Sequence, residues 1–472
     1  MSRYLAIDQG GHASRAIVFD ASGQPEVSAE HPIATRRPTP DQVEHDPEEI
    51  IGSVRHALQA LGRPPGTRIN AAGLATQRSS IVCWDRVTGE ALSPVISWQD
   101  RRAAETLIPL ASEQADIHRR TGLMLTPHYG ASKLRWCLDH LPAVARAGTE
   151  GRLAFGPLAS FLLFRLLDEQ PLVADPANAQ RTQLWNLATR DWDDILLDRF
   201  SIPRACLPAC VPTHHAFGSL RVAGQTVPLR ICQGDQPAAL FADGMPQSNC
   251  AYINVGTGAF AQRVFPEPVA HARLLTSLVW EQGDERIYVL EGTVNGAGSA
   301  LDWVAARHGM DEITDKLALW LMADTEPPLF LNGIGGLGAP HWVPNFESRF
   351  IGTGTTAQEA VAVAESILFL LQVNIDELAG AGRPLARIVM TGGLSQLDGL
   401  CQRMADLSGL PVWRPDAPEA TARGLACLVA GLPPTWSIAE GDSFTPRGND
   451  RLHQRYQQWR KLIDEVAARP DP

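Results

Sequence analysis

Two aspartates, Asp8 and Asp235, each close a short apolar run and stand next to or near a glycine. A carboxylate at the end of a strand can accept a proton from a substrate hydroxyl or hold Mg²⁺ through water. A single aspartate in such a place is more often a turn or cap residue. Pro237 and an alanine-rich run follow Asp235, which predicts a strand-to-helix turn with Pro237 at the first helical position. Asp235 should then point off the end of a sheet, where open α/β sheets bind ligands.

Two stretches of the chain, residues 4–20 and 251–265, share one layout. Each has an apolar run, a small polar residue, a tip that contains glycine and a second apolar run. This pattern predicts two β-hairpins whose tips can hold phosphate through inward-facing N–H groups. The second hairpin carries Asn254 where the first has Asp8. An internal repeat would give two domains built alike, and a chance likeness of two glycine hairpins is the alternative.

Arginine and tryptophan gather at predicted strand ends and loops in the first half of the chain, at Arg78, Trp98 and Arg101. A guanidinium can donate hydrogen bonds to hydroxyl oxygens, and an indole ring can cover the carbon face of a polyol. Structural salt bridges beside a core tryptophan explain the same residues equally well.

The stretch 333–338, GIGGLG, fits the glycine pattern of dinucleotide-binding loops. That pattern needs a helix to follow, and Pro340 and Pro344 prevent one. We expect the loop instead to bring its backbone close to a ligand or to another loop. The sequence contains no G-x-x-x-x-G-K-[ST] motif, which excludes a P-loop nucleotide site.

Length and composition indicate a globular protein of two or three domains, with 472 residues, 44% hydrophobic and 20% charged. The net charge of −11 argues against nucleic acid or an anionic membrane as the main partner. The eight cysteines match no zinc motif, so we expect reduced, buried thiols. The N-terminus lacks a signal pattern and the most apolar run, 159–167, is too short to cross a bilayer, which favours a cytoplasmic protein.

The spacing of apolar residues predicts the other elements. We expect helices at 46–61, 131–140, 158–167, 195–200, 299–306, 357–378, 397–407, 420–430 and 450–468, and strands at 25–37, 69–75, 81–84, 287–290 and 387–390.

Nine stretches, in this order along the chain, resemble the FGGY carbohydrate kinases, and among them the glycerol kinases. They are 7–20, 73–90, 96–102, 175–182, 190–194, 234–241, 254–260, 336–342 and 391–400. The resemblance implies an α/β fold of two actin-like (ribonuclease-H-like) domains with a central cleft. Residues 1–245 would form an N-terminal domain that binds the sugar or polyol, residues 246–435 a C-terminal domain that binds ATP, and residues 436–472 a C-terminal tail helix.

The activity that the resemblance implies is ATP-dependent phosphorylation of a hydroxyl of a small polyol or sugar, with Mg²⁺ as the metal. A homodimer is one assembly that the resemblance allows. The alternative is a catalytically weak family member that acts as a sugar-binding regulator, although the presence of both Asp8 and Asp235 argues against it. An actin-like ATPase without a sugar substrate would leave Arg78 and Trp98 without a role.

The family's site residues map onto this chain one by one. Asp235 matches the catalytic base, and Asp8 and Asp235 are the candidates to hold Mg²⁺. The substrate positions fall on Arg78, Ser79, Trp98, His128, Asp235, Gln236 and Phe260. The nucleotide positions fall on Gly10, Ser14, Arg15, Thr257, Gly258, Gly298 and Gly393.

Three positions depart from the pattern of the glycerol kinases. The first hairpin reads Gly11-His12 where two threonines are usual, so a hydroxyl contact to phosphate is lost. Ser79 replaces a glutamate, and His128 replaces an aromatic phenol. Because these two changes remove a carboxylate and a hydroxyl that would bind glycerol, they suggest a different or larger substrate, or weak activity on glycerol.

Overall fold

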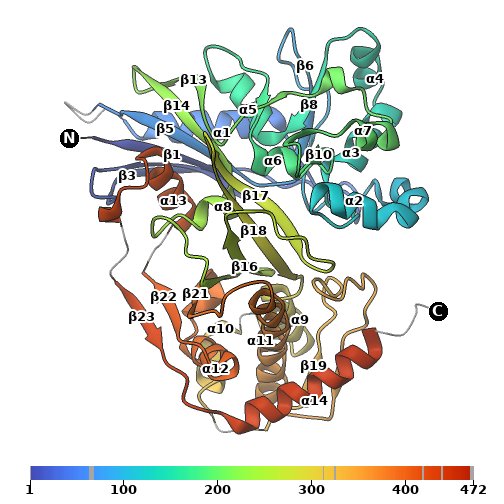
Figure 1. Cartoon of the computed structure of the whole chain (residues 1–472), viewed down its shortest axis with the longest axis vertical. Helices are drawn as coiled ribbons and strands as arrows, with labels where there is room; N and C mark the ends of the chain where they lie inside the picture. Colours follow the sequence, from blue (N-terminus) through green and yellow to red (C-terminus); the bar gives the residue numbers. More distant parts are fainter. Residues whose placement is uncertain are drawn as a thin grey trace.

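The computed structural model of the chain describes residues 2–62, 68–311, 313–323, 326–416, 419–436 and 440–467. The chain forms two α/β lobes, one above the other in Figure 1. The first lobe is built mainly from the first half of the chain and the second lobe mainly from the second half, as the colours of Figure 1 show.

A six-stranded sheet in the order β13-β14-β5-β1-β2-β3 forms the base of the first lobe. Strand β1 runs antiparallel to β2 and parallel to β5, and β5 runs parallel to β14. Gln9 of β1 and Gly234 of β14 both lie opposite Thr76 of β5, one on each side. The carboxyl ends of three strands therefore meet at one edge of the sheet. The strands are β1 (Tyr4–Gln9), β2 (Ala13–Phe19), β3 (Pro25–Pro32), β5 (Ala71–Thr76), β13 (His214–Val222) and β14 (Gln225–Gly234).

The sheet of the second lobe, in the order β17-β18-β16-β15-β21-β22-β23, repeats this arrangement. Strand β15 runs antiparallel to β16 and parallel to β21, as β1 does to β2 and β5. The hairpin loops are residues 10–12 and 256–258. The internal repeat and the two ribonuclease-H-like domains are thus confirmed. The strands are β15 (Cys250–Val255), β16 (Ala259–Phe265), β17 (Leu275–Gln282), β18 (Glu285–Val294), β21 (Arg387–Thr391), β22 (Val412–Pro415) and β23 (Gly441–Phe444).

Helices cover both sheets. Helix α1 (Pro47–Ala60) begins after Asp46, whose side chain accepts hydrogen bonds from the backbone N–H groups of Glu48 and Glu49. Helix α11 (Thr356–Gly380) begins with a capping box and forms the core of the second lobe. The other helices are α2 (Gln114–Thr121), α3 (Gly130–His140), α4 (Pro142–Thr149), α5 (Leu158–Leu166), α6 (Pro176–Gln180), α7 (Asp194–Phe200), α8 (Asp235–Ala239), α9 (Gly298–Arg307), α10 (Thr314–Trp320), α12 (Asp398–Ser408), α13 (Ala420–Val429) and α14 (Asp450–Ala467).

Smaller sheets complete the fold. A four-stranded sheet in the order β4-β7-β6-β8 packs in the first lobe. It consists of β4 (Glu44–His45), β7 (Val95–Ile96), β6 (Ile81–Asp85) and β8 (Leu153–Pro157). The remaining pairs are β9 (Val173–Ala174) with β12 (Ala209–Cys210), β10 (Trp185–Asn186) with β11 (Asp191–Trp192), and β19 (Leu329–Leu331) with β20 (Arg349–Ile351).

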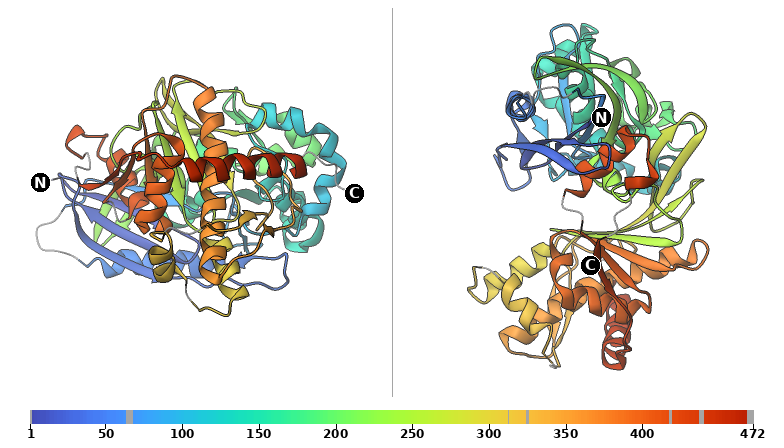
Figure 2. Two further views of the ribbon diagram at one scale, coloured as in Figure 1. Left: turned by 90° about the horizontal axis from the view of Figure 1, so that it is seen from below. Right: turned by 90° about the vertical axis from the view of Figure 1, so that its left-hand side faces the viewer.

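The chain returns to the first lobe near its end. Helix α13 packs against β1, β5 and α8, beside the first sheet in Figures 1 and 2. Gly424 permits this approach, because a Cβ there would lie 1.9 Å from the carbonyl oxygen of Ala238. Trp436 then packs against Tyr4 and Phe19, after which β23 and α14 rejoin the second lobe. The indole N–H of Trp459 in α14 donates to the carbonyl of Phe330 at 2.8 Å.

The predicted helices and strands are all present, with ends shifted by a few residues, and residue 468 lies outside the described residues. The prediction that Pro237 is the first residue of a helix is wrong by two residues, because α8 begins at Asp235 and Pro237 is its third residue. Proline fits there too, since no N–H of the first helical turn has an intrahelical partner. The amide of Asn295 donates to the carbonyls of Gly335 and Gly336, so the glycine-rich loop does approach another loop. All eight cysteines are free thiols, and seven are buried.

Across the described ranges, no helix is both long enough and apolar enough to cross a bilayer.

Trp436 should contribute strongly to stability, because its side chain is 0% exposed and its N–H donates to the carbonyl of Ala21 at 2.9 Å. We expect Trp436→Ala to lower the free energy of unfolding by about 3–5 kcal/mol, measured as a lower urea midpoint. The control is Ile108→Ala, at a side chain that is 71% exposed, which should change stability by less than about 0.5 kcal/mol. Equal midpoints for Trp436→Ala and wild type would contradict this account of the C-terminal segment.

Candidate active site

Three strand ends of the first sheet place Asp8, Arg78 and Asp235 beside one another. Asp8 lies one residue before the end of β1, Arg78 follows β5 by two residues, and Asp235 directly follows β14. The charge of Asp235 affects the ionisation of both Asp8 and Arg78. The parallel register thus brings together the residues that the sequence predicts for proton transfer, metal binding and substrate binding.

Desolvation shifts the pKa of both aspartates upward. The pKa of Asp8 rises to about 7, first because the carboxyl group is enclosed and then because Asp235 carries a like charge. Enclosure also raises the pKa of Asp235, while the positive charge of Arg78 opposes the rise. The backbone N–H of Gln236 donates to Asp235 Oδ1 at 2.8 Å. Asp235 is therefore held in place, with its pKa moved toward the range in which a carboxylate works as a base.

The side chain of Arg78 is fixed by close packing and by two polar partners. A Cβ at Gly234 would lie 2.5 Å from Cδ of Arg78, so only glycine leaves room for this arginine. The guanidinium donates to Oε1 of Gln236 and lies 3.5 Å from Oε2 of Glu291. Burial, and then the neighbouring Arg181, lower the pKa of Arg78 to about 10.

Glu291 of β18 brings the second lobe into the site. Its carboxylate is 1% exposed, lies 3.0 Å from Nη2 of Arg181, and accepts a hydrogen bond from Gln262. Burial alone would raise the pKa of Glu291, but the charges of Arg181 and Arg78 outweigh burial and hold this pKa at about 2. One carboxylate of the second lobe thus joins two arginines of the first.

Ser79, Trp98 and His128 form a second part of the site. The rings of Trp98 and His128 meet edge to face with centroids 5.6 Å apart. Ser79 has a φ of 63°, and its Oγ is buried without a hydrogen-bond partner in the part of the chain that the structure describes. Burial, and then the charge of Lys133, lower the pKa of His128 well below its usual range, so the ring is neutral at pH 7. A buried hydroxyl and a neutral imidazole are polar groups that can meet a ligand.

Three residues that organise this site were not singled out as site residues from the sequence: Lys133, Arg181 and Glu291. Lys133 donates to the backbone carbonyls of Ser79, Ser97 and His128. Their roles depend on contacts between distant segments, which spacing does not show. Lys133 offered one signal, since the chain contains only three lysines.

The tip of the second hairpin rests on the start of helix α9. The N–H of Gly298 donates to the carbonyl of Gly256 at 2.9 Å, and the N–H of Ser299 donates to that of Thr257 at 3.1 Å. A Cβ at Gly298 would lie 2.8 Å from the carbonyl oxygen of Gly256, which explains glycine at this position. The predicted nucleotide residues Thr257, Gly258 and Gly298 therefore lie together.

The backbone beside Gly393, which follows β21, is open. A Cβ at Gly393 would meet nothing within 4 Å among the described atoms. At Gly10, which follows β1, the nearest such atom is 3.5 Å away. Backbone that is accessible in this way can approach a phosphate or a nucleotide closely, as the prediction for these glycines requires.

The structure does not bring Ser14 to the site. Its side chain is 0% exposed, and its Oγ lies 2.7 Å from the Oγ of Ser53 in α1. Successive side chains of a strand point to opposite faces, so Arg15 lies on the other face of β2. Arg15 bonds to Glu30 and, at 2.6 Å, to Glu419, and its charge opposes the rise in the pKa of Asp8. We therefore correct the prediction for Ser14, whereas Arg15 lies near Asp8.

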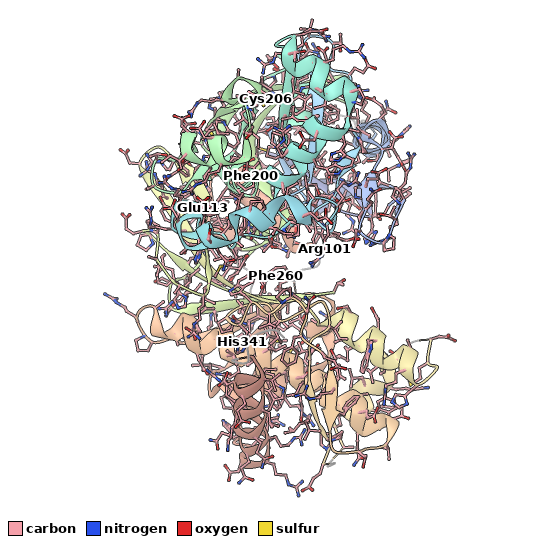
Figure 3. The ribbon with its side chains drawn as sticks, turned by 90° about the vertical axis from the view of Figure 1, so that its right-hand side faces the viewer. Arg101, Glu113, Phe200, Cys206, Phe260 and His341 are labelled. Carbon is pink, nitrogen blue, oxygen red and sulfur yellow. The ribbon has the colours of Figure 1, made fainter. Side chains whose placement is uncertain are left out.

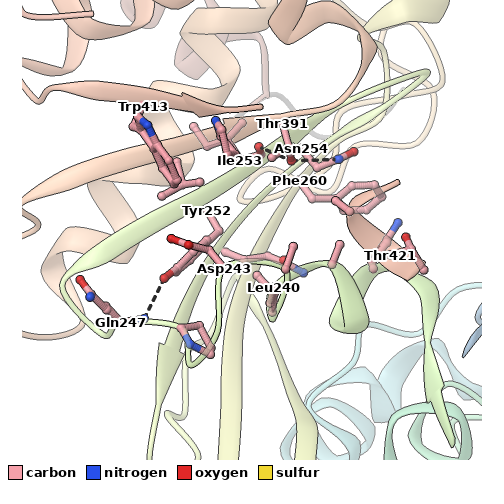
Figure 4. A pocket seen from close by; sticks show the side chains of 18 of the residues that line it. Leu240, Asp243, Gln247, Tyr252, Ile253, Asn254, Phe260, Thr391, Trp413 and Thr421 are labelled. Atoms are coloured by element: carbon pink, nitrogen blue, oxygen red, sulfur yellow. Dashed lines mark hydrogen bonds between the residues drawn. The ribbon is translucent and has the colours of Figure 1, made fainter. Parts of the chain in front are cut away.

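A cavity of about 320 Å³ extends from Asp235 between the lobes. Its wall combines α8 and the segment after it, strands β15, β16 and β21, and the start of α13. Gln236 and Phe260 line it together with Asp235, and Figure 4 shows Phe260 opposite Thr421. Figure 3 places Phe260 at the boundary of the lobes, below Arg101 of the first lobe.

The donor set of the site fits a cation that arrives with a phosphate. In the described residues no three or more His, Cys, Asp or Glu side chains stand close enough together to hold a metal ion. Asp8 and Asp235 nevertheless offer two hard carboxylate oxygen donors that repel each other. Mg²⁺ is commonly bound by one or two carboxylates together with water and substrate phosphates.

The sequence matches two domain descriptions of one family. Residues 3–242 match the N-terminal domain of the FGGY family of carbohydrate kinases, and residues 251–431 match its C-terminal domain. The chain is 36% identical to the glycerol kinase of Alkalilimnicola ehrlichii and 35% identical to that of Thermus brockianus, with 99% of each chain covered in both cases.

Solved structures share the fold. The glycerol kinase of Plasmodium falciparum, solved with ADP, superposes with a TM-score of 0.89 at 22% identity over 100% of this chain and 99% of the other. The xylulose kinase of Rhodospirillum rubrum superposes with a TM-score of 0.86 at 20% identity, covering 99% and 98%.

The raised pKa of Asp8 predicts that its charge destabilises the fold. An unfolded aspartate ionises near pH 3.9, whereas Asp8 in the folded chain ionises near pH 7. The cost therefore grows from about pH 4 to about pH 7 and is fully present above that. We expect Asp8→Asn, free of nucleotide and divalent cations, to stabilise the protein at pH 8 by on the order of 1–3 kcal/mol, and to lose this advantage near pH 4.

The measurement for Asp8→Asn is the unfolding midpoint across this pH range. The control is Asp198→Asn, at an exposed position of α7, which should stay within about 0.5 kcal/mol of wild type at each pH. A variant of Asp8 that is less stable than wild type at pH 8 would contradict the argument.

Proposed function

Since the chain belongs to the FGGY family of carbohydrate kinases, and so to a class of ATP-dependent sugar and polyol kinases, we propose that Asp235 is the base that activates the acceptor hydroxyl. One observation supports this most directly: Asp235 directly follows strand β14, lies beside Arg78 and lines the cavity between the lobes. The acceptor would lie between this carboxylate and Phe260.

The chain's own residues would divide the work as follows. Asp235 orients the acceptor hydroxyl and takes its proton as the phosphorus–oxygen bond forms. Arg78 and Gln236, which are bonded to each other, donate to other hydroxyls of the polyol. Phe260 from the second lobe covers carbon atoms. Closure of the lobes would exclude water, which competes with the polyol as acceptor.

Nucleotide and metal would occupy the space between the two hairpins. Gly10, Thr257, Gly258, Gly298 and Gly393 are the candidates for contact with ATP. Arg15 is near enough to Asp8 to act on the phosphates once it leaves its carboxylate partners. Asp8 and Asp235 would hold Mg²⁺, which neutralises phosphate charge when bound.

The acceptor is a small polyol or sugar, and glycerol is the first candidate because the two relatives named above are glycerol kinases. At Ser79 and His128 the chain departs from the usual pattern of the glycerol kinases. Serine is much smaller than glutamate, and its Oγ is buried and unpaired within the described ranges. We propose a polyol larger than glycerol, or a weak activity on glycerol, because a larger molecule could fill this space and bond to Ser79.

The setting of the enzyme is also a proposal. We propose the cytoplasm as the location, because all eight cysteines are free thiols, as is usual in a reducing compartment, and a homodimer is the assembly to test first. The ranges 1–245, 246–435 and 436–472 remain our proposal for the domain units of the sequence.

Loss of the base should remove most of the activity. We expect Asp235→Asn to lower turnover by about 10²–10⁴-fold, measured as ADP release with glycerol, erythritol, xylulose, ribulose and gluconate as acceptors. Asp198→Asn is the matched control and should keep full activity. Wild-type turnover in Asp235→Asn would show that another group takes the proton, and saturable binding without turnover in the wild type would indicate a regulator.

The two departures at the acceptor site predict a change of specificity. We expect the double variant Ser79→Glu, His128→Tyr to raise kcat/KM for glycerol, relative to the best wild-type acceptor, by about 10-fold or more, because it supplies a carboxylate and a phenol. His140→Tyr, at an exposed position of α3, is the control. An unchanged preference in the double variant would mean that specificity is set elsewhere.

A further inference from the structure

Lys133 of α3 is an ionisable side chain in the interior of the first lobe. It is 0% exposed and is one of only three lysines in the chain. Its Nζ lies 2.7 Å from the carbonyl oxygen of Ser97, 2.8 Å from that of His128 and 3.3 Å from that of Ser79. An ammonium group has three N–H bonds, so it can donate one hydrogen bond to each of these three carbonyls.

The three carbonyls belong to three separate segments of the chain. Ser79 follows Arg78 and has a φ of 63°, a conformation that costs energy for a residue other than glycine. Ser97 precedes Trp98, and His128 stands just before α3. Each anchored carbonyl is therefore in, or next to, a residue proposed to contact the polyol. One nitrogen atom is the common point of these segments.

The contacts around Lys133 indicate that its main role is not to stabilise the fold. In the described residues it forms no ion pair with a carboxylate, and the nearby charge of Asp100 is already taken by Arg102. Burial lowers the pKa of Lys133 to about 7, against the effect of Asp100. A buried amine without a carboxylate partner is a poor source of stability, because desolvation of the charge is costly.

We propose that Lys133 is a positioning residue that fixes Ser79, Trp98 and His128 and so determines the affinity for the polyol without touching it. This inference rests on the proposed function, because it assumes that these three residues contact the acceptor. Two further contacts tie the same segments together: the N–H of Trp98 donates to Oγ of Ser80 at 3.1 Å, and the rings of Trp98 and His128 are in contact.

The test compares Lys133→Met with wild type in two measurements. In steady-state kinetics we expect KM for the polyol to rise by about 10-fold to 100-fold, because displaced contacts misplace the acceptor, while KM for ATP changes less than about twofold. In hydrogen–deuterium exchange of the free protein we expect faster exchange in the segments around residues 79, 97 and 128 and unchanged exchange in β15, β16 and α9. A lysine that served only general stability would lower the active fraction without separating the two KM values.

Two other variants complete the design. Lys133→Arg keeps charge and donors and should give a smaller rise in KM, and it carries the test if Lys133→Met does not fold. Lys316→Met, at an exposed lysine of α10, should match wild type in both measurements. Unchanged exchange in the three segments overturns the inference, and so does an unchanged polyol KM in an active enzyme. If the wild type phosphorylates none of the acceptors, the proposed function fails, while the exchange measurement still decides whether Lys133 holds the three segments.

Discussion

The two-lobed site depends on the ion pairs that the carboxylate of Glu291 forms with two arginines. This carboxylate is buried between Arg78 and Arg181 of the first lobe, yet it belongs to a strand of the second. Without it, two guanidinium groups would be left close together in a buried place, where like charges repel strongly. The orientation of Arg78, which the acceptor site needs, is thus tied to the relative position of the lobes. Residues of either half alone would not form this site.

The charges at the other end of the site act in the opposite sense. Asp8 and Asp235 repel each other across the ends of β1 and β14, and desolvation raises the pKa of both. The fold therefore holds an ion cluster, in which Glu291 of the second lobe meets Arg78 and Arg181, and an unfavourable carboxylate pair at the edge of the first sheet. Unfavourable pairs of this kind are common where a protein must bind a cation or move a proton, and their cost is met by the rest of the fold.

Local signals in the sequence predicted most of the fold. The cap at Asp46, the apolar spacing of α11 and the glycines of both hairpins act over a few residues, so they can be read from the chain. The meeting of Asp8 and Asp235 could also be predicted, because the parallel register brings both strand ends to one edge of the first sheet. The prediction for Ser14 was wrong because its side chain points into the core against α1. The roles of Lys133 and Glu291 were missed because they depend on contacts with segments far away in sequence.

The return of the chain to its first lobe has a consequence for how the protein is made. Ala6, Ile17, Phe19, Ala75 and Ile231 pack in one apolar cluster with residues of α13 and with Trp436. When a ribosome has completed the first 245 residues, the segment that covers this face of the first sheet has not yet been synthesised. The newly made first lobe must therefore keep an apolar face uncovered while almost 200 more residues emerge. Its final packing can form only after most of the second lobe has been translated.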